Sequence, residues 1–442
     1  MQAWVEKDGT RVSPVEETVV TRLPRPVAWR RDAPESPFGA HFIAYGPVVK
    51  TMKAGGVNWA RLHDAGWKYT GWAAMEPEKG KWTWFDDEIR CYRENGIKIF
   101  AQLGTAPSWA THYGDLGCSH MGYFEKYLRP TNAVDWVNYV TTVVKRYEGV
   151  IDKWFVWNEP WGSWWQSAQD IKYYDKKRAG ADFATLTRQA YEAVKKVNPS
   201  LEVCGYNSTS GSGGEKWSED VEAGGGWDCC DAIDWHYYTP NVRAVRDDHA
   251  ISDDPLRPIR AKHPGLPGKR VYMSEGQGTS NGGSGIGCKM SGLYAETVPW
   301  APEDAATYVR LADWTCRYVV SLLAEGSEKV FLYSGHSYSN LAVPPKFQVL
   351  IGADGYAYPS LVSHAQMAQA LEGRKFVRKE NVGQNGVAYI FEGAGRTCTV
   401  YSELTPDEVL DLAARQPLKD VFGNLVTKET LLRGTLVYAG TF

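Results

Sequence analysis

Short apolar runs alternate with amphipathic segments along the chain from about residue 38 onward. The runs are rich in β-branched and aromatic residues, which favours strands. They are nearly continuous in their apolar character, as expected of parallel strands that are covered on both faces. Eight of them predict strands, at residues 38–45, 57–64, 97–104, 151–159, 201–208, 231–238, 270–276 and 329–335.

Most of these strands are followed by a segment with helical periodicity. The predicted helices cover residues 46–56, 85–96, 132–149, 181–199, 303–326 and 360–373. Eight strands that alternate with helices predict an α/β fold of the (β/α)8 TIM barrel class. The main alternative is an open, doubly wound sheet. Such a sheet would usually carry a glycine-rich phosphate loop after an early strand, and the sequence has none.

The pattern changes after residue 373, where short strand-like runs are separated by turn residues. These runs lie at 375–380, 386–393, 397–403, 418–424 and 435–440. They predict a small C-terminal β-sandwich. The strand-like segment 16–23 is a candidate to add strands to this sandwich. We therefore expect three parts: an N-terminal segment at 1–34, the barrel at 35–372 and the sandwich at 373–442.

Three predicted loops are unusually long, at about 105–130, 160–180 and 276–302. Loops of this length inside a compact domain are usually functional. All three follow the carboxyl ends of barrel strands, which is the face where barrels of this class build their sites. We expect the functional site at that face.

Composition excludes several classes of partner. The net charge is −3, so no basic surface favours nucleic acid or an anionic membrane. No apolar run reaches the roughly 18–20 residues that span a bilayer. The first ten residues lack the apolar core of a signal peptide, so the protein is either cytoplasmic or has lost an export signal. Its 19 Trp and 25 Tyr fit a carbohydrate partner, although large cores also use tryptophan.

The sequence gives no indication of a metal or another cofactor. Histidines are few, nine in all, and neither H-x-H nor HExxH occurs. The adjacent Cys229 and Cys230 have no partner at a zinc spacing. Cys118 and Cys288 lie in predicted loops and would be able to pair in an oxidising compartment. Oligomeric state is left open.

Two glutamates stand at the ends of predicted strands, Glu159 after strand four and Glu275 after strand seven. A single glutamate there more often caps a helix or pairs with an arginine. In a barrel, however, both would face the same mouth, and Asn158 and Pro160 flank the first. Two carboxyl groups within aromatic walls match the requirements of glycoside hydrolysis, which needs one protonated acid and one ionised nucleophile or base.

Four motifs support this interpretation. The segments "WNEP" (157–160) and "YMSEG" (272–276) resemble the acid/base and nucleophile motifs of clan A retaining glycoside hydrolases. The segments "WARLHD" (59–64) and "DWHYY" (234–238) are similar to strands two and six of family 39, which includes β-xylosidases and α-L-iduronidases. The resemblance covers about residues 38–372. It implies a retaining hydrolase of O-glycosidic bonds in oligo- or polysaccharides; the alternative is a non-catalytic, carbohydrate-binding barrel.

The resemblance also assigns roles to the two glutamates. Glu159 would be the general acid/base, with its pKa raised by apolar surroundings, and Glu275 the nucleophile, kept ionised by hydrogen-bond donors. A separation of about 5–5.5 Å between the two carboxyl groups would give retention of configuration, and about 6.5–9.5 Å would give inversion. We expect the short separation.

Further side chains are expected around this pair. Arg61 would supply positive charge to the nucleophile, and Tyr238 or its neighbour Tyr237 a hydrogen bond. Asn158 would bond the sugar 2-hydroxyl. Many clan members place a tryptophan after strand eight, where this chain has Tyr333, so another tryptophan is expected to supply the sugar platform. The other candidate substrate or supporting residues are His41, His63, Trp109, Trp161, Trp164, Trp165, His236, Ser334 and His336.

Overall fold

A computed structural model gives the fold of most of the chain. It describes residues 2–3, 6–13, 16–17, 23, 36–112, 128–161, 165, 175–209, 212–239, 256–278, 305–336, 350–352, 357–393 and 395–440. Large parts of the three long predicted loops, together with Trp164, Cys118 and Cys288, lie outside these residues.

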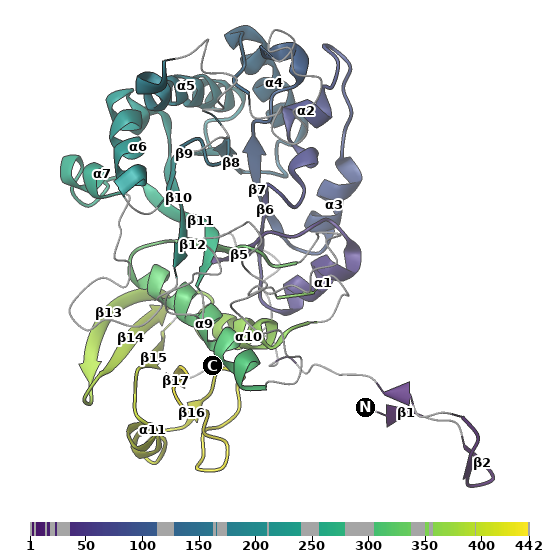
Figure 1. Cartoon of the computed structure of the whole chain (residues 1–442), viewed down its shortest axis with the longest axis vertical. Coiled ribbons are helices and arrows are strands. Elements are labelled where there is room, and N and C mark those ends of the chain that lie inside the picture. The colour runs from purple at the N-terminus through teal and green to yellow at the C-terminus, as the bar shows by residue number, and fades with distance from the viewer. Residues whose placement is uncertain are drawn as a thin grey trace.

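Eight parallel strands close into a barrel in which each strand pairs with its neighbours in the chain (Figure 1). The last strand pairs with the first, Val330 lying opposite Phe38. The strands are β5 (Phe38–Ala40), β6 (Trp59–Leu62), β7 (Lys98–Leu103), β8 (Lys153–Val156), β9 (Glu202–Thr209), β10 (Ala232–Thr239), β11 (Arg270–Gly278) and β12 (Lys329–Leu332). Each overlaps one of the eight predicted runs, and the prediction of a TIM barrel is confirmed.

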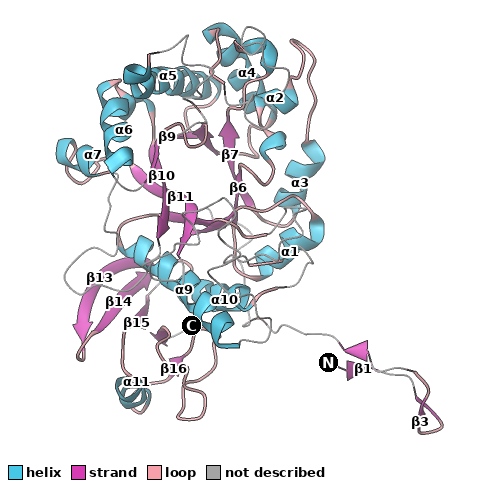
Figure 2. Cartoon of the chain, in the orientation of Figure 1, coloured by secondary structure: helices cyan, strands magenta, loops and turns pink. Residues whose placement is uncertain are grey.

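Helices surround the barrel strands (Figure 2). They are α1 (Gly46–Ala54), α2 (Trp72–Met75), α3 (Asp86–Glu94), α4 (Ala133–Arg146), α5 (Ala179–Val197), α6 (Ser212–Ala223), α7 (Arg257–Lys262), α9 (Ala305–Ala324) and α10 (Pro359–Leu371). In α4, Trp136, Tyr139, Val140 and Val143 are buried, which is the i, i+3, i+4, i+7 spacing of a helix packed on a sheet. None of the helices in the described part of the chain combines the length and the apolar character that a bilayer crossing requires.

Seven strands contribute one side chain each to an apolar layer, which we call the barrel floor. Its members are Trp59, Phe100, Phe155, Cys204, Ala232, Tyr272 and Phe331. The eighth strand contributes Gly39, where a Cβ atom would lie 2.4 Å from the Phe331 ring, so only glycine leaves room for that ring. Because strand residues alternate between faces, the next inward-facing layer, two residues further along each strand, stands on this floor.

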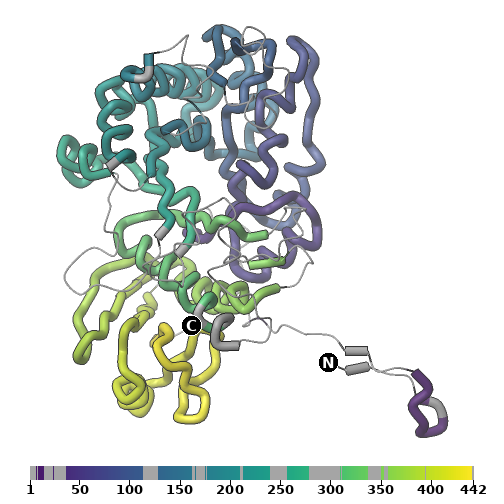
Figure 3. Tube along the Cα trace, viewed as in Figure 1, coloured from purple at the N-terminus to yellow at the C-terminus, as the bar shows by residue number. Residues whose placement is uncertain are grey.

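A separate antiparallel sheet forms the C-terminal β domain, and the predicted fold class is confirmed. Its strands run in the order β13-β14-β15-β17-β16 (yellow-green to yellow in Figure 3). Their bounds are β13 (Lys375–Val382), β14 (Gly386–Gly393), β15 (Arg396–Ser402), β16 (Leu418–Lys419) and β17 (Val437–Gly440), and α11 (Pro406–Ala413) follows β15. The boundary expected at 372/373 falls between α10 and β13.

The expected addition of N-terminal strands to this sheet is absent among the described strands. Instead, β1 (Gln2–Ala3) pairs with β4 (Glu16–Glu17), and β2 (Glu6–Lys7) pairs with β3 (Thr10–Arg11). The N-terminal segment therefore makes its own short ladders in the part that the structure describes.

Candidate active site

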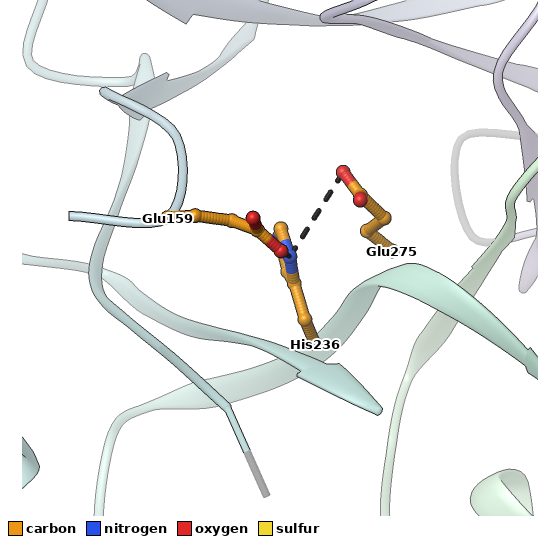
Figure 4. Close-up of side chains that lie close together, drawn as sticks. All are labelled: Glu159, His236 and Glu275. Carbon is orange, nitrogen blue, oxygen red and sulfur yellow. Dashed lines mark hydrogen bonds and ion pairs between the residues drawn. The ribbon is translucent and has the colours of Figure 1, made fainter. Parts of the chain in front are cut away.

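Glu159 and Glu275, the two glutamates singled out in the sequence, lie together at the carboxyl ends of the barrel strands. Glu159 follows β8, and Glu275 lies near the end of β11. One oxygen of each carboxyl group lies within 4.8 Å of the other and of a nitrogen of His236. Figure 4 shows the Glu159 carboxyl group beside the His236 ring, and a dashed line joins His236 to Glu275, whose Oε2 lies 3.9 Å from Nδ1. Glu275 is the more buried of the two, with a side-chain exposure of 4% against 23% for Glu159.

Two donors hold the Glu275 carboxylate. Arg61 Nη1 donates to its Oε2 at 2.8 Å, and Tyr238 Oη donates to its Oε1 at 2.8 Å. Tyr238, rather than Tyr237, is therefore the tyrosine that contacts the carboxylate, while the Tyr237 ring stacks on Tyr318. Such charge-assisted bonds favour the ionised form of a carboxyl group.

Arg61 also fixes the protonation of His236. Its guanidinium stands over the Phe155 ring of the barrel floor at 4.2 Å, and its Nη2 lies 3.3 Å from His236 Nε2. A guanidinium can only donate, so Nε2 must accept, and the ring proton is on Nδ1. Nδ1–H then donates to Glu159 Oε1 at 2.9 Å. Burial lowers the pKa of His236 to about 3, so the imidazole is neutral.

Arg61 Nη2 makes one further bond, to Asn158 Oδ1 at 2.8 Å. This bond fixes the orientation of the Asn158 amide, since the oxygen must face the guanidinium. Arg61 thus contacts Glu275, Asn158 and His236 directly. It is linked to Glu159 through His236. Arg61 and His236 are fully buried, so the centre of this network lies outside bulk water, while Glu159 reaches solvent.

The backbone that delivers Glu159 is strained. Trp157 and Glu159 have φ angles of 67° and 44°, in the left-handed region that non-glycine residues rarely adopt. Asn207 on β9 braces this turn, because its Nδ2 donates to Trp157 O at 3.0 Å and to Val156 O at 3.3 Å. Backbone outliers of this kind persist only where the surroundings hold them, and they cluster at functional sites.

A second polar group, which we call the rim cluster, consists of His63, Asp64, Gln102 and Tyr333. His63 Nε2 lies 3.1 Å from Asp64 Oδ1, and His63 Nδ1 lies 3.2 Å from Gln102 Oε1. Tyr333 Oη donates to Asp64 Oδ2 at 2.8 Å. Burial alone would lower the pKa of His63, but the charge and hydrogen bond of Asp64 outweigh it and raise that pKa.

His41 lies behind this cluster. Its ring packs edge-on against Tyr333, with centroids 5.1 Å apart, and its Nε2 donates to Ser274 O at 3.1 Å. Burial, and then the charge of Arg61, lower the pKa of His41 well below its usual range. It is therefore a neutral, buried support. Ser334 and His336 are also buried, and Ser334 Oγ donates to the His336 carbonyl at 3.1 Å.

The candidate platform tryptophans differ in position. Trp161 is half-buried and stands edge-on to His236, with ring centroids 5.2 Å apart, so it adjoins the two glutamates. Trp165 is 2% exposed and packs on Trp157 within the core. Trp109 packs against Trp72 and donates to Glu76 O at 2.9 Å. Of the three, Trp161 is the one whose contacts place it beside the two glutamates.

Sequence reasoning missed Asp64, Gln102, Asn207 and Asp234. Asp234 is fully buried, and burial raises its pKa to about 7 although the charge of Arg61 opposes the rise. Strand alternation was the available signal for Asp234, because Asp234 precedes His236 by two residues and so shares its face. Asp64 lies beyond the end of β6, and Asn207 has a positive φ angle of 41°. Strand alternation therefore could not have identified either residue.

Glu159, His236 and Glu275 also have the composition of a metal site. A metal would need the lone pair of His236 Nδ1, because this atom faces the two carboxylates. Arg61 instead requires Nε2 to accept, which leaves the proton on Nδ1. The trio is arranged to hold and move protons rather than to coordinate an ion.

Comparisons with known proteins locate the fold. Neither a family model nor a curated relative matches the sequence. A family 39 glycoside hydrolase from Bacteroides cellulosilyticus superposes with a TM-score of 0.64 at 18% identity, over 99% of this chain and 84% of that one. A family 39 enzyme from Xanthomonas axonopodis has a TM-score of 0.54 at 15% identity, over 87% of this chain and 74% of that one. A monomeric β-xylosidase from Caulobacter crescentus has a TM-score of 0.52 at 17% identity, over 90% of this chain and 80% of that one. The chain therefore has the fold of these family 39 glycoside hydrolases.

Proposed function

We propose that this chain is a retaining glycoside hydrolase that cleaves O-glycosidic bonds of oligo- or polysaccharides. The observation that carries the proposal is the meeting of Glu159 and Glu275 across one mouth, with carboxyl oxygens within 4.8 Å. The fold, shared with family 39 hydrolases, supports it. A β-xylosidase and a glucosidase among the similar structures make β-xylosides and glucosides the first substrates to test.

The reaction begins with formation of a glycosyl-enzyme. An oxygen of Glu275 attacks the anomeric carbon while protonated Glu159 gives its proton to the departing glycosidic oxygen, so that the old C–O bond breaks as the new one forms. Because Glu159 Oε1 accepts the bond from His236, the transferable proton sits on Oε2. Arg61 and Tyr238 hold Glu275 ionised and aimed before the attack.

The second step releases the sugar. Glu159, now a carboxylate, takes a proton from water as the water oxygen attacks the anomeric carbon, and Glu275 leaves as a carboxylate. The neutral His236 donates to Glu159 in its charged form and remains an acceptor of Arg61. Two inversions give net retention, and the short distance between the carboxyl groups favours this course over direct attack by water. Asn158 is positioned to bond the sugar 2-hydroxyl, a contact that strengthens in the transition state.

Removal of the nucleophile tests the proposal. Glu275→Ala should lower kcat/KM for an aryl glycoside by roughly 10⁴-fold or more, since no attacking group remains. Azide or formate should restore part of the activity by occupying the vacated space. Wild-type protein should also gain the mass of one sugar from an activated 2-fluoro glycoside, on a peptide that contains Glu275.

A matched control is available at the opposite end of the same barrel. Glu202→Gln makes a comparable carboxylate neutral at the start of β9, where it pairs with Lys153 at 3.1 Å. Unchanged turnover in this variant would show that the loss of activity in Glu275→Ala comes from removal of Glu275 itself. Full activity of Glu275→Ala, or a first product of inverted configuration by NMR, would contradict the proposal. Absence of both turnover and labelling would favour a carbohydrate-binding barrel without catalysis.

A further inference from the structure

The carboxyl end of β9 carries a bulge beside the turn of Glu159. The ladder between β9 and β10 shifts register between Ile233 and Trp235, so that Tyr206 and Asn207 together lie opposite one residue of β10. Both have positive φ angles, 66° and 41°. Few residues with a side chain adopt this region, and a bulky aromatic residue there is an outlier. Such a conformation persists only where the surroundings hold it.

Asn207 connects this bulge to the turn that carries Glu159. The backbone ladder between β8 and β9 includes Phe155 on β8. The next two carbonyl groups along the chain, those of Val156 and Trp157, accept from Asn207 Nδ2 at 3.3 Å and 3.0 Å. Glu159 follows two residues later. The backbone that leads to the proposed acid is therefore tied to β9 through the Asn207 side chain.

Helix α6 holds the other residue of the bulge. It lies outside the barrel strands, beside β9 (Figure 1). Trp217 Nε1 donates to the Tyr206 carbonyl at 3.1 Å, and the Tyr206 hydroxyl group donates to Glu222 Oε2. One residue beyond the bulge, Ser218 Oγ donates to Ser208 Oγ at 2.9 Å. Tyr206 is thus bonded to α6 at both its backbone carbonyl and its hydroxyl group.

Glu222 is itself fixed from α7. Lys262 Nζ and His263 Nε2 lie 2.6 Å and 2.8 Å from its Oε1, and its side chain is 10% exposed. Burial alone would raise the pKa of this carboxyl group, but the hydrogen bonds from Lys262, Tyr206 and His263 outweigh it and lower that pKa. Burial, and then the bond to Glu222, raise the pKa of Tyr206. The phenol therefore stays protonated and donates to a carboxylate, which makes a strong hydrogen bond.

We propose that Tyr206, held by Glu222 through its hydroxyl group, is a positioning residue for Glu159. The bond keeps the bulge in the conformation from which Asn207 reaches the turn of Glu159. This inference rests on the proposed function, in which Glu159 gives its proton to the leaving group. The position of the proposed acid is thus set partly from outside the barrel, by a bond between β9 and α6.

The test removes the Tyr206 hydroxyl group and keeps its ring. Tyr206→Phe is compared with wild type on methyl and dinitrophenyl glycosides of the same sugar, the xyloside or glucoside that is hydrolysed. A methyl glycoside needs a proton on its leaving group, whereas dinitrophenolate leaves without one. We expect kcat/KM to fall about threefold to tenfold for the methyl glycoside and less than about twofold for the dinitrophenyl glycoside.

A double variant tests whether Tyr206 acts through Asn207. If it does, adding Tyr206→Phe to Asn207→Ala should change the ratio of methyl to dinitrophenyl activity by less than about 1.5-fold, because the bonds that Tyr206 supports are already gone. If the hydroxyl group acted independently, the two losses would multiply. Looser packing of α6 alone would lower activity toward both glycosides equally, and their ratio would not change.

Tyr191→Phe is the matched control. Tyr191 on α5 also donates to a carboxylate, Asp231 Oδ1 at 3.4 Å, but Asp231 directly precedes β10 and so lies at the amino ends of the strands. Its ratio should stay within about 1.5-fold of wild type. Glu222→Leu removes the acceptor in place of the donor. It should reproduce the effect of Tyr206→Phe, and it replaces that variant if Tyr206→Phe fails to fold.

The bond from His236 to Glu159 gives a readout that needs no turnover. His236 Nδ1 donates to Glu159 Oε1 at 2.9 Å, so the NMR signal of this imidazole proton reports the position of the carboxyl group. The signal should shift in Tyr206→Phe and stay unchanged in Tyr191→Phe.

Three outcomes would overturn the proposal: an unshifted imidazole signal, an unchanged ratio in the folded variants, or losses that multiply in the double variant. None of them would affect the assignment of Glu159 and Glu275. If wild-type protein neither hydrolysed a glycoside nor bound the 2-fluoro label, the proposed function itself would fail. The imidazole signal would then still decide whether Tyr206 positions Glu159.

Discussion

At the residue scale, Arg61 determines the state of its neighbours more than any other side chain of the site. It donates to Glu275, Asn158 and His236. These bonds favour the charged form of the Glu275 carboxyl group, orient the Asn158 amide and place the imidazole proton of His236 on Nδ1. A lysine could not replace it, because one ammonium group cannot present donors to three partners in this planar arrangement. The two histidines on either side of Arg61 consequently differ, His236 being neutral and His63 having a raised pKa.

The raised pKa of His63 gives a direct prediction. Its NMR titration in wild-type protein should show a pKa above 6.5, because Asp64 outweighs the effect of burial. In Asp64→Asn, burial and the Arg61 charge still lower the pKa and only the charge of Glu275 opposes them, so the pKa should fall relative to wild type. A group whose folded pKa is raised stabilises the fold below its unfolded pKa, and this contribution is lost as pH rises through the folded value. Equal titration curves in the two proteins would contradict the assignment.

At the element scale, the sequence predicted all eight barrel strands because buried parallel strands are continuous apolar runs. It missed α6, whose first residues, Ser212 to Gly214, include two glycines that weaken a helical pattern. It also left Tyr237 and Tyr238 undecided. In the structure His236 and Tyr238, two residues apart on β10, both reach the Arg61–Glu275 pair, so strand alternation from His236 favours Tyr238.

The turn after β8 depends on Asn207, which gives an element-scale prediction. Asn207→Ala removes two hydrogen bonds to the strained turn that carries Glu159, so this residue, the proposed acid, should lose its position. We expect kcat to fall by about 10-fold to 100-fold for alkyl glycosides, whose poor leaving groups need a proton. Dinitrophenyl glycosides, which need none in the first step, should be affected less in kcat/KM. Equal losses for both substrates, or none, would show that Asn207 does not position Glu159.

At the scale of the whole molecule, the barrel and the C-terminal sheet are joined through α9. Arg317 on α9 donates to Asp313 at 2.5 Å, and beyond the helix to Ser402, Glu403 and the carbonyl of Gly434. Asp313 accepts in turn from the Leu436 backbone at 2.7 Å. The sequence predicted both domains but not this junction, because nothing in a helical pattern shows which of its polar residues will be buried against another domain.

Removal of Arg317 should therefore destabilise the protein. Arg317→Met leaves Asp313, which is 2% exposed, buried without its cation, and such a change costs about 3–5 kcal/mol of unfolding free energy. Burial already raises the pKa of Asp313 while Arg317 opposes the rise, so the variant should bind a proton there more readily. A raised carboxyl pKa favours the folded state at low pH and disfavours it as pH rises through the folded value, and the loss should be smaller at acidic than at neutral pH.

Urea unfolding at two pH values, followed by fluorescence and circular dichroism, measures this effect. Arg178→Met is the control, because Arg178 pairs with Asp182 at 3.8 Å while remaining 72% exposed, and an exposed pair contributes about 0–1 kcal/mol. A loss for Arg317→Met no larger than that of the control would mean that the junction does not stabilise the fold. A separate early transition of the C-terminal sheet would mean instead that Arg317 couples the unfolding of the two domains, since the same side chain bonds both.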